Sequence, residues 1–138
     1  MSTFMNYRQL SGVQGNAEEK VVGVDGLPVT IATAAAVTFS VRQILSGLIL
    51  RDPAGDARAD LLPTAALIIA ALANPEVGAW FEFTIRNTAD AAETITVTTA
   101  TGLTLSGTMT IAQNASRRFR AVVTSSTAVS VYSLNPTH

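Results

Sequence analysis

The sequence has no cysteine, and its one histidine is His138, the last residue. Without cysteine the chain has no disulfide framework, no thiol nucleophile and no Cys-ligated zinc or iron–sulfur site. A single histidine at a chain end, where chains are usually mobile, provides neither a Ser-His-Asp triad nor a histidine-rich metal centre. We therefore expect a protein that is not an enzyme and that has no metal and no cofactor.

Charge is also scarce, because 14% of the residues are charged where a soluble domain has about 25%. Nine basic residues stand against ten acidic ones, and a nucleic-acid surface needs an excess of Lys and Arg. We expect no nucleic-acid partner and, for the same reason, no membrane partner. The first eight residues lack the apolar stretch of a secretory signal, so we expect no signal peptide.

What takes the place of charge is mostly Ala, Thr and Val. A neutral surface of this kind can be covered by another chain at little desolvation cost, which favours an oligomer or a coat component. A GC-rich genome would also raise alanine, and it explains the same composition equally well. The 138 residues fit one domain.

Residues 1–20 are polar and show no regular spacing of apolar residues, which is typical of an extended N-terminal arm. Fully extended, such an arm spans roughly 60 Å, enough to reach a neighbouring subunit. A frayed terminus is the alternative. Residues 21–138 are predicted to form a single domain.

Short segments in which apolar and polar residues alternate dominate this domain. Strands are expected at 21–24, 29–31, 37–41, 44–50, 80–86, 93–98, 103–105, 109–111, 119–123 and 129–131. Many of them follow one another at intervals of about 8–12 residues, separated by turn signals, which is typical of a sandwich or barrel. We predict a mostly β fold, an antiparallel β-sandwich of jelly-roll type.

One short α-helix is expected at about 63–73, between Pro63 at its first turn and the stop at Asn74-Pro75. It is about 16 Å long, half of a membrane span. Because it is apolar on nearly every side, we expect it to be buried all round, either in the core or on the axis of an oligomer. Leu67 and Ile68, together with Trp80, are predicted to pack in the core or at a subunit interface.

Two groups of side chains are candidates for a site. Acidic residues at 52, 56 and 60 suggest calcium, but the ligand pattern of a calcium loop is missing, so a polar loop is favoured. The segment 116–120, Ser-Arg-Arg-Phe-Arg, is the one basic cluster. Strand alternation separates Arg118 and Arg120 from Arg117. A solvated strand face, an acidic protein partner and, last, nucleic acid are the possible interpretations.

The segment 50–134 contains several turn-and-strand phrases. They are LRDPAG at 50–55, LPTAA at 62–66, FTIRNTA at 83–89, LSGTMTI at 105–111 and VYSL at 131–134. These phrases resemble small structural proteins of tailed bacteriophages, in particular the capsid decoration or cement proteins.

The resemblance implies a β-rich homotrimer in the virion, on the outer surface of an icosahedral capsid, where it would bridge and stabilise neighbouring copies of the phage major capsid protein. Such a component is made in the host cytoplasm. Exposed arm and loop residues are the expected capsid contacts: Tyr7, Arg8, Arg51, Arg58 and Arg117.

Three other functions stay open. The first is a receptor- or carbohydrate-binding domain of a phage head or tail fibre, with Tyr7, Trp80 and Tyr132 as its aromatic face. The second is a polysaccharide-degrading enzyme, and the third is a tail component.

Overall fold

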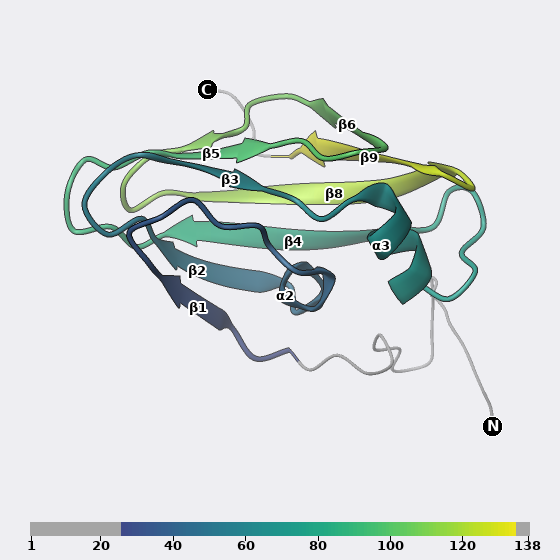
Figure 1. Ribbon diagram of the computed structural model, residues 1–138, viewed down its shortest axis with the longest axis horizontal. Coiled ribbons are helices and arrows are strands. Elements are labelled where there is room, and N and C mark those ends of the chain that lie inside the picture. Colours follow the sequence, from purple (N-terminus) through teal and green to yellow (C-terminus); the bar gives the residue numbers. More distant parts are fainter. Residues whose placement is uncertain (1–25, 135–138) are drawn as a thin grey trace.

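The computed structural model describes residues 26–134, and this part of the chain is mostly β (Figure 1). A six-stranded sheet has the order β1 (Val29–Ala32), β2 (Leu48–Asp52), β4 (Trp80–Asn87), β8 (Ser116–Ser125), β9 (Ala128–Ser133) and β6 (Leu103–Ser106). A three-stranded sheet has the order β3 (Arg58–Leu61), β5 (Ile95–Thr98) and β7 (Thr110–Ile111). The helices of this part are α2 (Val41–Leu45) and α3 (Ala65–Ala71). The arm expected at 1–20 and the strand expected at 21–24 lie outside the described residues.

Both sheets are mixed, so the expected antiparallel arrangement holds for only some of the strand pairs. Strand β2 lies parallel to β1 and to β4, β6 lies parallel to β9, and β3 lies parallel to β5. The pairs β4–β8, β8–β9 and β5–β7 are antiparallel. Alternation of apolar residues gives the side of a strand that is buried, but not the direction of its neighbour, because both kinds of pair share the period of two.

Alternation did predict the buried side chains of the second half of the chain. Phe81, Phe83 and Ile85 of β4 point inward, and the ring of Phe83 stacks on that of Phe119 at a centroid distance of 5.2 Å. Residues of the three-stranded sheet belong to the same hydrophobic cluster: Ile95, Val97 and Ile111. Both sheets therefore contribute to one core.

A strand was expected at 37–41 and another from Ile44, but the structure has a short helix, α2, in this region. Ser40 caps it, since its Oγ accepts a hydrogen bond from the Gln43 amide at 3.1 Å. The side chain of Gln43 in turn accepts one from the Ser40 amide at 2.8 Å. This capping box stabilises the first turn of the helix, although the β-branched residues before it favour a strand. The next strand begins only at Leu48.

Helix α3 lies inside the predicted range 63–73, but it is not buried all round. Thr64 is its N-cap, and only Ala65 and Ile68 are buried, whereas Leu67 is 57% exposed. Gly102, where φ is +85°, packs closely against the buried side of α3. A residue with a Cβ at this position would place that atom 2.6 Å from the Cβ of Ala65. Within residues 26–134, no helix is long and apolar enough to cross a membrane.

Candidate interaction surface

The outward-facing side chains of β4, β8 and β9 form the most distinctive surface of the described chain. In the register of the sheet, Glu82 lies opposite Arg120, and Arg120 lies opposite Tyr132 on its other side. Trp80 and Arg118 are each two residues away along the same faces of β4 and β8. We call Trp80, Glu82, Arg118, Arg120 and Tyr132 the arginine–aromatic face.

Arg120 is the centre of this face. Its Nε and Nη2 both donate to Oε2 of Glu82, at 2.9 and 2.6 Å. Its guanidinium carbon lies 4.1 Å from the centroid of the Trp80 ring, which is a cation–π contact. Arg118 approaches the other oxygen of Glu82, with Nε 4.0 Å from Oε1. One carboxylate is thus held between two guanidinium groups beside an indole.

These side chains are in contact with one another and yet open to solvent. Trp80 is 54% exposed and Tyr132 is 40% exposed, and the side chain of Arg118 is 60% exposed. Trp, Tyr and Arg are the residue types most enriched at the centres of protein–protein interfaces, where Lys and Glu are depleted. Trp80 was expected in a core or a subunit interface, and the structure places it outside the core of the protomer.

Arg51 was expected on the surface, as a capsid contact, and this expectation is wrong. Its side chain is fully buried and pairs with Asp60, with 2.7 Å between Nε and Oδ2. Its Nη1 and Nη2 donate to the backbone carbonyls of Thr33, Asp52 and Ala35. The short alternating strand β2 turns this residue inward together with Ile49, where the sequence suggested a loop.

The other expected contacts are dispersed. Arg58 is half-buried and donates from Nε to the carbonyl of Pro53 at 3.1 Å. Arg117, also half-buried, donates from Nε to the carbonyl of Thr110 at 2.8 Å and from Nη1 to the hydroxyl of Ser133. Tyr7 and Arg8 lie outside the described residues.

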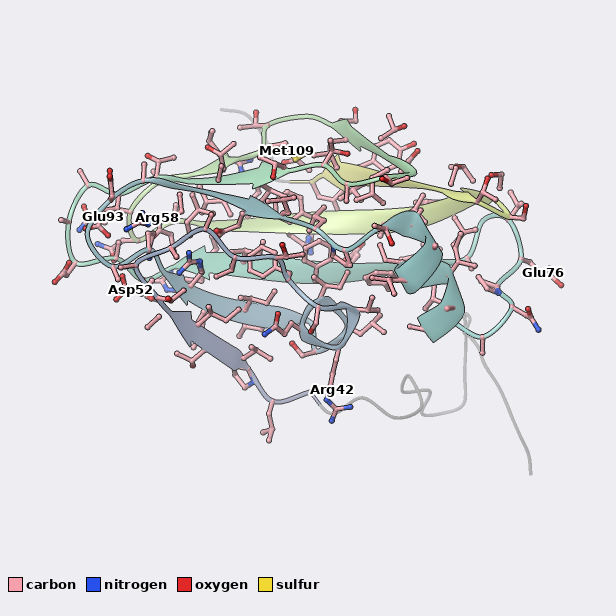
Figure 2. The ribbon with its side chains drawn as sticks, viewed as in Figure 1. Arg42, Asp52, Arg58, Glu76, Glu93 and Met109 are labelled. Atoms are coloured by element: carbon pink, nitrogen blue, oxygen red, sulfur yellow. The ribbon has the colours of Figure 1, made fainter. Side chains whose placement is uncertain are left out.

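The acidic residues at 52, 56 and 60 do not converge. Asp60 is committed to Arg51, while Asp52 and Asp56 each accept a hydrogen bond from a nearby loop amide. Figure 2 shows Asp52 at the same end of the molecule as Arg58 and Glu93. In residues 26–134 there is no group of three or more His, Cys, Asp or Glu side chains that could hold a metal ion.

Glu82 is the member of the face that was not expected from the sequence. The alternation of β4 places Glu82 outward together with Trp80, and that of β8 places Arg118 and Arg120 outward. What was needed in addition was the register of the two strands, since 38 positions separate Glu82 from Arg120.

Comparison of the chain with family models, curated proteins and solved structures found no match.

Proposed function

We propose that the protein is a non-enzymatic structural component of a phage virion. It decorates the outside of an icosahedral capsid as a homotrimer and stabilises the shell by bridging neighbouring major capsid proteins. The observation that carries the proposal is the arginine–aromatic face, an exposed surface with the composition of a protein-binding site. The phrases that resemble tailed-phage structural proteins supply the identity of the partner.

A second surface, which is apolar and lies on α3, supports self-association. On α3 the exposed side chains are Ala66, Leu67, Ala70 and Ala71, and Val77 in the following loop is 69% exposed. A helix face of this kind carries no charge to be desolvated when a second protomer covers it. The expectation that Leu67 packs at a subunit interface is therefore kept, whereas Ile68 is 1% exposed and packs within the protomer.

We also propose that the two sheets form a β-sandwich. The support is that side chains of both sheets belong to one hydrophobic cluster, as they do where two sheets pack face to face. The jelly-roll order of the strands stays a prediction, and the parallel pairs described above would make it a mixed variant of that type.

The first test is the mass of the purified chain by light scattering coupled to size exclusion, followed by co-sedimentation with phage heads that lack the protein. We expect about three times 14.4 kDa and saturable binding to heads, because a trimer that contacts several capsid subunits binds by multivalency. A monomer that does not sediment with heads would contradict the proposal.

Leu67→Asp tests the subunit interface. We expect a folded monomer, because the side chain is exposed in the protomer while a charge would be buried in the trimer. Folding is monitored by circular dichroism, and Arg42→Asp, on the exposed surface of α2, is the matched control that should remain trimeric. A trimeric Leu67→Asp variant would contradict the placement of the interface on α3.

Carbohydrate binding is the second candidate function. It is favoured by the exposure of Trp80 and Tyr132 on one sheet face, where flat rings could stack on sugars. Against it, one face of the Trp80 ring is covered by the Arg120 guanidinium. A glycan array with signals that disappear in Trp80→Ala would favour this function over capsid binding.

A further inference from the structure

We infer that the arginine–aromatic face binds an acidic segment of its protein partner, whose carboxylates are held by Arg118 and Arg120 next to Trp80. The inference deepens the proposed function and rests on it for the identity of the partner, a capsid subunit. The chemistry of the ligand follows from the side chains of the face itself.

The face has an excess of positive charge. Its charged members are two arginines, Arg118 and Arg120, and one carboxylate, Glu82, and Arg86 lies further along the same face of β4. Residues 26–134 as a whole have equal numbers of arginine and of acidic residues, and no lysine. The excess is therefore a local property of this face, and charge complementarity favours a negatively charged partner.

The face already shows how it holds a carboxylate. Glu82 accepts two hydrogen bonds from Arg120 and lies 4.0 Å from Arg118. The contacts of Arg120 use Nε and Nη2, and its Nη1 makes no hydrogen bond with any described residue. Glu82 and the Trp80 ring fix the plane of the guanidinium, so that Nη1 is oriented in advance for a second carboxylate.

A peptide fits this arrangement better than a nucleic acid does. A phosphate backbone places a charge at every nucleotide and would bring several of them close to Glu82, which repels them. The carboxylates of an acidic protein segment are separate, and they can approach the two arginines from the side away from Glu82. The indole edge and Tyr132 then offer apolar contact to the stem of the same segment.

The experiment measures binding of the full chain to poly-L-glutamate at low ionic strength, with heparin and a single-stranded DNA oligonucleotide in parallel. We expect poly-L-glutamate to bind best and its affinity to fall as salt is raised. Arg118→Ala/Arg120→Ala should weaken binding at least about 10-fold, because charge-assisted hydrogen bonds to the ligand are lost at both positions. Glu82→Gln should strengthen binding, because the competing carboxylate is gone. Arg42→Ala, at the α2 position labelled in Figure 2, should change nothing.

Any of three results would overturn the inference. Poly-L-glutamate does not bind, it binds the double variant as tightly as it binds wild type, or it binds wild type less tightly than heparin or DNA does. Phage heads separate this outcome from that of the proposed function. Heads bound equally by wild type and the double variant overturn the inference and leave the proposed function standing. A chain that binds poly-L-glutamate through these arginines but does not bind heads overturns the proposed function alone.

Discussion

Two arginine–carboxylate pairs of nearly equal length lie in opposite surroundings. Arg51 and Asp60 are 2.7 Å apart and both side chains are fully buried. Arg120 and Glu82 are 2.6 Å apart, with 40% and 27% of their side chains exposed. The same contact therefore serves two roles, and what surrounds it decides which.

The buried pair joins the two sheets, because Arg51 belongs to β2 and Asp60 to β3. Around it, the guanidinium donates to three carbonyls, and Asp60 accepts from the amide of Val37 at 3.0 Å. The exposed pair lies across two neighbouring strands of one sheet, and Nη1 of Arg120 makes no hydrogen bond with any described residue. A buried pair with all its partners inside the chain holds a fold, whereas an exposed one can hold a ligand.

Arg51→Met should have the largest effect on stability of the substitutions at these two pairs. It leaves the charge of Asp60 buried without its counter-ion, and removing one partner of such a pair costs about 3–5 kcal/mol. The carbonyls of Thr33 and Ala35 also lose their donor. Urea unfolding followed by circular dichroism should show this loss in the free energy of unfolding.

The double variant Arg51→Met/Asp60→Leu is the control. With both charges gone it should be more stable than Arg51→Met alone, although it should not reach wild type because the Val37 amide loses its acceptor. If Arg51→Met unfolds at the wild-type urea concentration, the pair does not hold the sheets together.

Arg120→Met should have a smaller effect. It removes an exposed ion pair, with a contribution of about 0.2–1 kcal/mol, and a cation–π contact of about 0.5–1 kcal/mol. Because methionine covers part of the Trp80 ring, we expect a loss of about 1 kcal/mol in the same urea experiment, with Arg42→Met as the control. A loss as large as that of Arg51→Met would mean that the exposed pair is structural after all.

Much of the fold was readable from the sequence wherever one strand face is apolar. The inward residues of β4, β5, β8 and β9 follow from alternation alone, and so does the existence of α3 from its apolar run between Pro63 and Pro75. The helix α2 was missed because Val41 is β-branched and the evidence for a helix is the pair Ser40 and Gln43, three residues apart. The exposure of Leu67 was missed because an apolar residue in a sequence shows no sign of what covers it.

The candidate site was less predictable from the sequence than the fold. Arg51 and Arg120 have the same chemistry in the sequence, and both lie on strands with a neighbour on each side. Arg51 is enclosed because its face of β2 meets Asp60 of the other sheet. The arginines at 118 and 120 were assigned to one strand face by alternation, but Glu82 joins them through a register that spans 38 positions of the chain. Contacts between distant strands depend on the whole fold, so no local pattern contains them.

Glu82→Gln should have the smallest effect on stability of the substitutions at these two pairs. The amide oxygen of Gln can still accept from Arg120, so only the charge is lost, and we expect a change below about 0.5 kcal/mol in the free energy of unfolding. Salt should erase even this difference at ~1 M, because the pair is exposed and screened, whereas Arg51→Met should remain destabilised at the same salt concentration. Stability and binding are then separated in one residue: Glu82→Gln leaves the fold as it is while it changes the affinity for a carboxylate ligand. A variant with lost stability and unchanged affinity would place Glu82 among the residues that hold the fold, beside Asp60.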